Sequence, residues 1–414
     1  KLFTYSQGCM GDKTGIYMGT GSKTMEPIAK NTMKGTGAQN LLVVAETGGG
    51  KSFYVKVLII MFLINGYAVN VLDYEGDEYT PIGTYLGGNI ISLRGADTKY
   101  FDTVEIGTLT GDDEIDKPLK DNAIQVTKRI FDIICDEENG MTASEAAIFS
   151  DAINEVYREA GVTNDKHTWV KSKGKSNHDV YQKIKSYENL ELYQNRYGND
   201  LSKFVDKLKV FFDEDGMYSF VFKNKITFDE VVKNNFNIFS FGMAGGNQVA
   251  SDPKLFKLKQ LFTSHITTLI NNYNKHIKHI HTFNVIEEAQ RYLALEGAAS
   301  IVSDLVTGAR KRDAVTAICS NSPLSIIESK DVHSIAIADN ITTVVIGKLK
   351  MDTAKKVAEY YNAPHCIKML NDIATLPQYE HYFLLKIGTN YSMVKMDIPE
   401  GVAKSAIFKT RNGE

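Results

Sequence analysis

Ala45-Glu46-Thr47-Gly48-Gly49-Gly50-Lys51-Ser52 is the segment that most constrains the architecture of this 414-residue chain. It follows the β-prone run 40–44 and leads into a long apolar run, 53–64. A short strand, a glycine-rich turn, Lys-Ser and a helix-length segment form the order typical of a phosphate-binding loop. Glycines let successive backbone N–H groups face an anion, and the positive amino end of the following helix adds to the attraction. The segment therefore predicts binding of a nucleoside triphosphate.

Each position of this loop has an expected contact. Lys51 would reach the β- and γ-phosphates, and the Ser52 hydroxyl would hold Mg²⁺. The pattern G-x-x-x-x-G-K-[ST] asks for glycine where this chain has Ala45, and alanine fits there if its φ is not positive. The alternative interpretation is a glycine-rich surface turn before a buried helix. The predicted nucleotide-binding residues are Thr47, Gly48, Gly49, Gly50, Lys51, Ser52 and Phe53.

Composition and length indicate an ordinary globular protein. Hydrophobic residues make up 43% and charged residues 23% of the chain, which is long enough for two domains or for one domain with an insertion. The net charge of −3 means that a nucleic-acid partner would need a local basic patch.

The cysteines and the apolar runs indicate a cytoplasmic location. Cys9, Cys135, Cys319 and Cys366 are widely scattered, which is typical of reduced thiols and not of a disulfide framework or zinc site. The longest apolar run, 57–64, is far shorter than the ~20 residues of a membrane-spanning helix. Because the sequence begins at Lys1, we expect a piece of a longer or engineered protein, and any upstream membrane anchor or partner domain would lie outside this sequence.

A βαβ unit surrounds the loop. A helix over 52–65 stops at Asn65-Gly66, and a strand over 68–72 follows, which implies a parallel sheet covered by helices. The second strand ends in the acidic segment 73–79, at the sheet edge where ligands bind in such folds. These carboxylates could orient Mg²⁺-bound water or contact a neighbouring subunit, or they could form a solvated loop; the sequence leaves these alternatives open.

Residues 117–215 lack strand alternation and show helical spacing of apolar residues, with a helix start at Thr142-Ala143-Ser144-Glu145. We expect an all-helical insertion here. Within it, the segment 166–185 contains six lysines and Trp169. A flexible, solvated linker is the favoured interpretation, and a grip on a nucleic-acid backbone is the alternative.

The second half of the chain returns to strand texture at 218–222, 236–241 and 282–286, with a helix over about 254–272. The last of these strands ends in Glu287-Glu288. Two acids at such a point can place one carboxylate in the Mg²⁺ shell and the next beside the attacking water. Aspartate is usual in the first position, so Glu287 adds one methylene.

Two further polar positions follow. The segment 307–313 contains Arg310, which is either a cation favoured at a helix carboxyl end or an arginine finger acting on a neighbouring subunit. The strand 314–319 ends near Asn321, whose amide could sense the γ-phosphate. Further elements are predicted at a helix over 352–361 and at strands over 342–346, 382–387 and 392–396.

This order of parts resembles the conjugation ATPases of type IV secretion systems, the VirB-four/TraC/TrbE class, within the RecA-like HerA/FtsK group. The resemblance covers nearly the whole chain but only the ATPase half of a typical member. The segment 378–395 also resembles the closing hairpin of that class. The matching motifs are 45–52, 71–79, 284–289, 308–312 and 317–323.

The resemblance implies an α/β fold: a RecA-like P-loop NTPase core with a mostly parallel sheet and an inserted all-α subdomain. It implies ATP and Mg²⁺ as ligands, a homo-hexamer with sites between subunits, and a cytoplasmic position beneath an inner-membrane secretion channel. Channel and coupling proteins would be partners, and DNA contact is open. The implied roles are metal binding by Ser52 and Glu287, and catalysis by Glu288, Lys51, Arg310 and Asn321.

We therefore expect four segments in the chain. They are an amino-terminal strand and loop segment (1–34), the first part of the ATPase core (35–110), the all-α insertion (111–215) and the second part of the core (216–414).

The leading functional hypothesis is an ATP-hydrolysing motor of conjugative type IV secretion. A HerA/FtsK-like or coupling-protein DNA translocase is the first alternative. A nucleotide-binding assembly scaffold with little turnover is the second, suggested by Ala45, Glu287 and Asn321, which depart from the usual motif.

Overall fold

The computed structural model describes residues 12, 15–33, 39–136, 138–242, 252–294, 298–377, 380–403 and 405–408. The chain forms two compact units, the first from 1–90, 234–240 and 280–414, and the second from 91–233 and 241–279. The predicted insertion, 111–215, is contained in the second unit. Residues 1–11 of the predicted amino-terminal segment, Cys9 among them, lie outside the described residues.

An eleven-stranded sheet organises the first unit, in the order β2-β1-β13-β12-β11-β3-β10-β9-β4-β8-β5. The six strands from β11 to β8 run parallel, and antiparallel strands extend the sheet beyond β11. The strands are β1 (Ile16–Gly21), β2 (Pro27–Lys30), β3 (Asn40–Val44), β4 (Ala68–Asp73), β5 (Asn89–Ser92), β8 (Phe236–Ser240), β9 (Thr282–Ile286), β10 (Ala314–Ser320), β11 (Ile341–Ile346), β12 (Tyr382–Ile387) and β13 (Asn390–Lys395).

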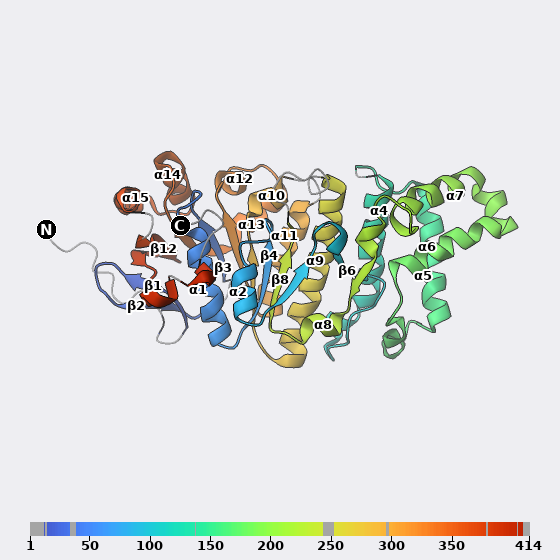
Figure 1. The fold of residues 1–414 in the computed structure, drawn as a ribbon, viewed down its shortest axis with the longest axis horizontal. Coiled ribbons are helices and arrows are strands. Elements are labelled where there is room, and N and C mark those ends of the chain that lie inside the picture. The colour runs from blue at the N-terminus through green and yellow to red at the C-terminus, as the bar shows by residue number, and fades with distance from the viewer. Residues whose placement is uncertain are drawn as a thin grey trace. The chain divides into compact units, whose positions relative to one another are not determined.

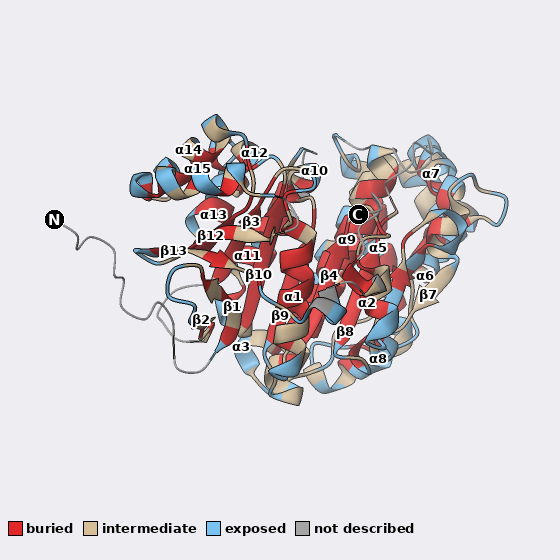
Figure 2. Cartoon of the chain, turned by 60° about the vertical axis from the view of Figure 1, so that its left-hand side comes forward, coloured by how far each residue is buried: buried red, intermediate tan, exposed pale blue. Residues whose placement is uncertain are grey.

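Helices cover this sheet on both faces, as Figure 1 shows. Every residue of β3, β4, β8, β9 and β10 is buried, which is the pattern of parallel strands enclosed on both sides (Figure 2). The helices of this unit are α1 (Lys51–Ile64), α2 (Thr80–Tyr85), α10 (Ala289–Leu293), α11 (Ala298–Thr307), α12 (Leu324–Ile327), α13 (Val332–Asp339), α14 (Met351–Tyr360), α15 (Ile367–Thr375) and α16 (Glu400–Ala403), with 3-10 turns η7 (Arg310–Arg312), η8 (Pro364–Cys366) and η10 (Ala406–Phe408).

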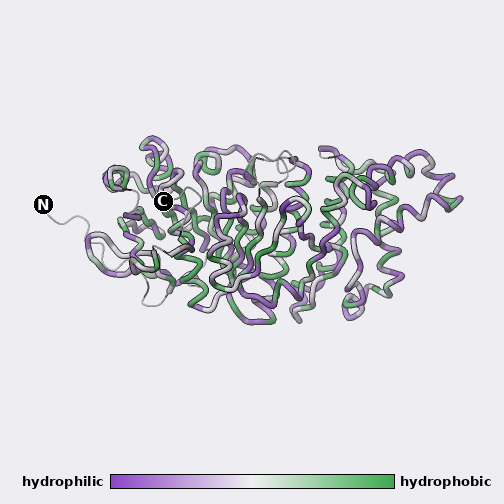
Figure 3. Tube along the Cα trace, viewed as in Figure 1, coloured by the Kyte–Doolittle hydropathy of each residue, from purple (hydrophilic) through white to green (hydrophobic). Residues whose placement is uncertain are grey.

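Helix α1 begins directly after the glycine-rich loop and ends where the sequence predicts. Gly50 precedes it with a φ of 85°, and Gly66 follows its end with a φ of 81°, conformations that glycine adopts without strain. Apolar residues on all sides of α1, among them Val55, Leu58 and Phe62, are buried. The helix is therefore fixed by the core and holds the loop in place. Hydrophobic segments of the chain appear in green in Figure 3.

A row of asparagines crosses the sheet inside the first unit, and we call it the asparagine row. Asn89 donates to Asn237 (3.4 Å), Asn237 to Asn70 (3.2 Å) and Asn70 to Asn284 (3.1 Å). Asn70 lies opposite both Asn237 and Asn284 in the strand register. Since buried amides need partners, the row ties β5, β8, β4 and β9 to one alignment.

The second unit is mainly helical, with a parallel two-stranded sheet. A capping box of Thr142 and Glu145 opens α5, as the sequence predicts. Its elements are β6 (Lys99–Phe101), β7 (Asn224–Ile226), α3 (Asp113–Asp116), α4 (Leu119–Cys135), α5 (Ala143–Ala160), α6 (Asn177–Ser186), α7 (Glu191–Phe212), α8 (Phe228–Val232) and α9 (Pro253–Tyr273), with η1 (Gly95–Asp97), η2 (Lys166–Ser172), η3 (Tyr187–Asn189), η4 (Ser219–Phe222) and the π-helical turn η6 (Asn274–Lys278).

The predicted strand at 218–222 is wrong, because this segment forms the 3-10 turn η4. The N–H of Val221 donates to the Tyr218 carbonyl, a bond between residues three apart. Phe222 packs among aromatic rings, with centroids 4.6 Å from Phe212 and 5.5 Å from Tyr100. Tertiary packing here overrides the β-propensity of an aromatic run.

The favoured linker interpretation of 166–185 is also wrong. The segment forms η2 and α6, and Trp169 is only 6% exposed, with its indole N–H donating to the Thr163 carbonyl. Lys173 pairs with Asp229 at 2.7 Å, and Lys183 pairs with Glu159. Trp169 is therefore largely packed inside the second unit, and it lines a pocket of about 320 Å³ together with Lys166 and Lys173.

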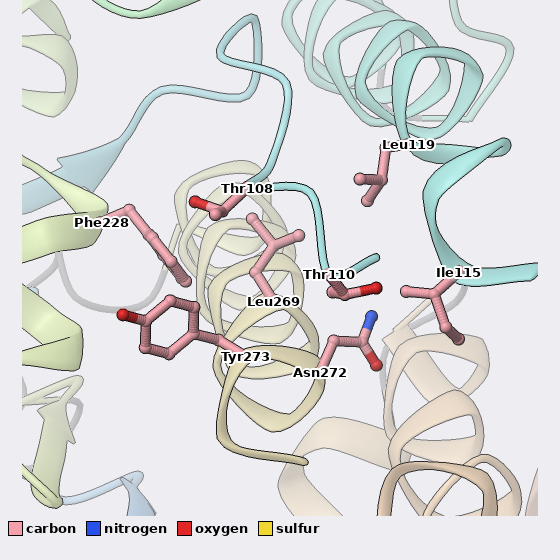
Figure 4. Close-up of a pocket in the computed structure, with 8 residues that line it drawn as sticks. All are labelled: Thr108, Thr110, Ile115, Leu119, Phe228, Leu269, Asn272 and Tyr273. Carbon is pink, nitrogen blue, oxygen red and sulfur yellow. The ribbon is translucent and has the colours of Figure 1, made fainter. Parts of the chain in front are cut away.

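A cavity of about 10 Å³ lies beside α9 in the second unit (Figure 4). Hydroxyl, amide and apolar side chains line it, including Thr110, Leu269 and Asn272. Such a volume holds about one water molecule, so the cavity is a packing feature and not a ligand site. Among the described helices, none combines the length and apolar character needed to cross a membrane.

Candidate nucleoside triphosphate site

The loop between β3 and α1 forms a cradle that admits only very small residues. The N–H of Glu46 donates to the Lys348 carbonyl (2.7 Å), and the N–H of Gly49 donates to the Glu46 carbonyl (2.8 Å). A Cβ on Gly49 would lie 2.9 Å from the Ala45 Cβ and 3.0 Å from the Lys348 carbonyl oxygen. Gly48, with a φ of 77°, also favours glycine. This geometry fits the close approach of backbone N–H groups to phosphate oxygens.

Ala45 meets the condition that the sequence sets for it. Six described residues other than glycine have a positive φ, and Ala45 is not one of them. Its methyl group is fully buried and faces Gly49 and Gly347. Alanine therefore fits because its two neighbours have no side chains.

Lys51 connects the loop to the acidic pair. Its ammonium group donates to Glu287 Oε1 and, at 3.1 Å, to Glu288 Oε1. Burial lowers the pKa of Lys51, but the two carboxylates outweigh it and hold the pKa above its usual value. Three predicted site residues, distant in sequence, thus share one buried ion cluster.

The two acids stand at the carboxyl end of β9. The N–H of Glu287 donates to the Leu72 carbonyl at 3.1 Å, which continues the strand pairing. Glu288 leaves this pairing with a φ of 52° and a ψ of 45°, and α10 begins at the next residue. Non-glycine residues in this region are strained and gather at functional sites, so the position of Glu288 supports a chemical role.

Asn321 reaches Glu288 from β10, the strand between β3 and β9. Its amide donates to Glu288 Oε2 at 3.1 Å. Gln290, which the sequence analysis did not single out, donates to Glu288 Oε2 and to Asn321 Oδ1 (2.9 Å). Ser320 completes the cluster by donating to Gln290 Oε1 at 2.7 Å. The one local feature that could have identified Gln290 as a site residue is its amide, two residues after the acidic pair.

The acidic segment 73–79 is not a solvated loop, because none of its residues is exposed. Asp73 accepts the N–H groups of Gly76 (2.9 Å) and Tyr79 (3.1 Å), and burial raises its pKa to about 7. The hydroxyl of the fully buried Tyr79 donates to Glu287 Oε2 at 2.9 Å. The segment therefore supports the site from the neighbouring strand, and Tyr79 is its contact.

The carboxy-terminal hairpin packs against the loop through Phe53. The Phe53 ring stacks on His381 with centroids 3.7 Å apart and planes 5° apart. A Cβ on Gly50 would lie 3.4 Å from His381 Nδ1 and 3.1 Å from Phe383. The Phe53 side chain is thus a packing contact beside the predicted nucleotide-binding backbone.

Arg310 is the one predicted catalytic residue that lies away from the cluster. It precedes the amino end of β10, while Asn321 follows the carboxyl end of that strand. A seven-residue strand spans roughly 20 Å, so Arg310 and the cluster stand at opposite edges of the sheet. The exposed Arg310 cannot act on the site of its own chain.

The residues present also fit Mg²⁺. A serine hydroxyl and carboxylates are the oxygen ligands that this ion accepts, together with substrate phosphates and water. Ser52 follows Lys51 at the first turn of α1, and Glu287 lies within hydrogen-bond distance of Lys51. These residues would hold the ion.

Three features define a P-loop NTPase with a RecA-like fold: a glycine-rich loop with a lysine after β3, an acidic pair after the parallel strand β9, and a polar strand end on β10 between them. The family model described as "Helicase HerA, central domain" matches residues 38–305, more than half of the chain. The chain therefore belongs to this family.

Solved structures support the same fold. VirB4 of Thermoanaerobacter pseudethanolicus superposes with a TM-score of 0.70 at 18% identity, covering 95% of this chain and 99% of that one. The unbound bacterial conjugative coupling protein TrwB gives 0.57 at 15% identity, covering 94% and 90%. TrwB with the ATP analogue ADPNP gives 0.52 at 15% identity, covering 97% and 100%. No curated protein sequence matches the chain.

Proposed function

We propose that this protein hydrolyses ATP with Mg²⁺ and powers a conjugative type IV secretion system. The observation that carries the proposal is the buried cluster of Lys51, Glu287, Glu288 and Asn321 at one edge of the sheet. The structural similarity to VirB4 and TrwB supports it, since TrwB has been solved with ADPNP and with ADP and Mg²⁺.

Lys51 would change partners when ATP binds. Its ammonium group pairs with Glu287 and Glu288. The β- and γ-phosphates of ATP offer it a stronger anion, so binding would withdraw it from the acids and free their oxygens.

Glu288 would then orient and deprotonate the attacking water, while Asn321 holds the far oxygen of its carboxylate. Ser52 and Glu287 would hold Mg²⁺, which supplies positive charge against the charge on the phosphoryl oxygens. Lys51 adds to this electrostatic stabilisation, which is the main source of rate in phosphoryl transfer.

We propose that Arg310 acts as an arginine finger on a neighbouring copy in a homo-hexamer. Because it lies across the sheet from the site of its own chain, an arginine finger at this position must act on another copy. A ring of subunits places one edge of each copy against the next. The partners of this assembly would be secretion-channel and coupling proteins at the cytoplasmic face of the membrane.

The test of this function is the Lys51→Ala variant. ATP turnover should fall at least about 100-fold, because charge stabilisation of the phosphoryl group is lost. Lys368→Ala removes an exposed lysine on α15 and should retain wild-type turnover. Circular dichroism of both variants checks the fold. Unchanged turnover in Lys51→Ala would contradict the assignment.

A DNA translocase is the second candidate, favoured by the family match to a helicase domain and by the similarity to a coupling protein. Duplex DNA should then raise ATP turnover, and the effect should weaken steeply with salt. If DNA does not change ATP turnover at low or at moderate salt, the secretion motor is favoured.

A further inference from the structure

Glu287 has an additional contact that the P-loop motif does not supply. Its Oε1 accepts from Lys51, and its Oε2 accepts from the Tyr79 hydroxyl at 2.9 Å. Tyr79 comes from the turn after β4 and not from the loop or from β9. The carboxylate is therefore held from two sides by groups of different kinds.

The Tyr79 ring is fixed independently of Glu287. It is fully buried, and its own N–H is bound by Asp73 Oδ2. Neighbouring Glu78 pairs at 2.8 Å with Lys56, a fully buried lysine of α1 whose ammonium lies 5.9 Å from the Tyr79 ring. The turn is thus anchored to the helix that carries Lys51.

The two oxygens of Glu287 have separate partners. Lys51 binds Oε1, whereas Oε2 is bound by the Tyr79 hydroxyl, which belongs to a different element. If Lys51 moves to the phosphates, the Tyr79 bond would remain and Oε1 alone would be released.

We propose that Tyr79 is a positioning residue that fixes the Glu287 carboxylate so that only Oε1 turns toward Mg²⁺. Glutamate has one more rotatable bond than the aspartate usual at this place, and the Tyr79 bond restrains that extra freedom. The inference rests on the proposed ATPase function, and it explains how the chain tolerates Glu287.

Tyr79→Phe removes only the hydroxyl. We expect the Mg²⁺ concentration that half-saturates binding of a fluorescent non-hydrolysable ATP analogue to rise about tenfold, the effect of losing one hydrogen bond to a charged group. Binding of the same analogue in EDTA should stay unchanged. Circular dichroism must show that the variant is folded, because reversible partial unfolding would also raise the apparent half-saturation.

Tyr54→Phe is the matched control. It also removes a fully buried hydroxyl, one that donates to the Met18 carbonyl at 2.9 Å, and it should leave the Mg²⁺ half-saturation unchanged. In a Glu287→Asp background the shorter carboxylate does not reach Tyr79. There, Tyr79→Phe should change the half-saturation less than about twofold.

The possible results separate this inference from the function on which it rests. If Tyr79→Phe keeps the wild-type Mg²⁺ half-saturation while the wild type hydrolyses ATP, the positioning role is refuted and the ATPase function stands. If the wild type neither binds the analogue nor hydrolyses ATP, the proposed function itself is refuted.

Discussion

Ala45, Glu287 and Asn321 each differ from the residue usual at their place in the motif, and each has a local partner that fits the difference. Ala45 faces two glycines, Gly49 and Gly347. Glu287 accepts from Tyr79, and Asn321 donates directly to Glu288. Because these adjustments preserve one connected cluster, they favour turnover over a scaffold with little hydrolysis.

Ala45→Gly restores the usual motif and should change little in the site. Nucleotide affinity should stay within about twofold of wild type, because the Ala45 methyl is buried and packs between the glycines Gly49 and Gly347. The free energy of unfolding should fall by about 0.4–1 kcal/mol, since glycine adds entropy to the unfolded chain. Urea unfolding and analogue titration measure the two effects. A large gain in affinity would show that alanine impairs the cradle.

The local pattern of the sequence predicts the loop and both acids, but it cannot predict what holds them. Lys51 and Ser52 follow from a motif that occupies eight consecutive residues. Tyr79 and Glu287 are 208 positions apart, and their contact depends on the pairing of β4 with β9. Gln290 is likewise an ordinary helix residue until the fold places Asn321 beside it.

Among the elements, the carboxy-terminal hairpin makes a contact with the start of α1 that its sequence does not predict. His381 precedes β12, has a positive φ of 51° and stacks on Phe53 at the start of α1. Its Nδ1 is buried and has no hydrogen-bond partner among the described residues. The hairpin therefore packs a neutral imidazole against the glycine-rich loop.

This contact makes stability depend on pH. Burial, with a smaller effect of Lys395, lowers the pKa of His381 from 6.5 to about 4. Between these values the unfolded chain binds a proton that the folded chain does not, so stability falls as the pH drops through 6.5 toward 4. The free energy of unfolding falls by at most about 3 kcal/mol, and the partial exposure of the ring makes the loss smaller than this limit.

His381→Phe should retain the stack and remove this part of the pH dependence. Denaturant unfolding at pH 7 and pH 4.5 should show a smaller difference in the variant than in the wild type. His365→Phe, at an exposed histidine, should behave as wild type. Equal losses in wild type and His381→Phe would show that other groups cause the acid sensitivity.

Elements with a strong local pattern were predicted almost to the residue, and those fixed by packing were not. β3 and α1 match because an apolar run, glycines and a second apolar run leave little freedom. The turn η4 and the segment 166–185 depend on which aromatic side chains they meet. Phe222 packs against Tyr100, and Trp169 lines a pocket with Phe101 and Leu269, all of which are distant in sequence.

At the scale of the whole molecule, we propose that the active site is shared between copies. One copy would contribute Lys51 and Glu288, and another would contribute Arg310 from the opposite sheet edge. Turnover per chain should therefore rise steeply with protein concentration until the oligomer is complete.

A mixing experiment tests this sharing. Arg310→Ala should lower turnover by about 10³-fold with nucleotide binding intact. Lys51→Ala copies still carry Arg310, so an equal mixture of the two variants in a ring should recover about a quarter of the wild-type sites. If the mixture is as inactive as either variant alone, Arg310 does not complete the active site of a neighbouring copy.

The asparagine row has a consequence for how the protein assembles. A strand that joined the sheet one residue out of step would turn its amide to the other face and leave donors and acceptors buried without partners. Each such group costs about 1–3 kcal/mol. Asn70 would forfeit two bonds at once, to Asn237 and Asn284. The row therefore destabilises sheets with a shifted strand register, in which the active-site residues would also be out of position.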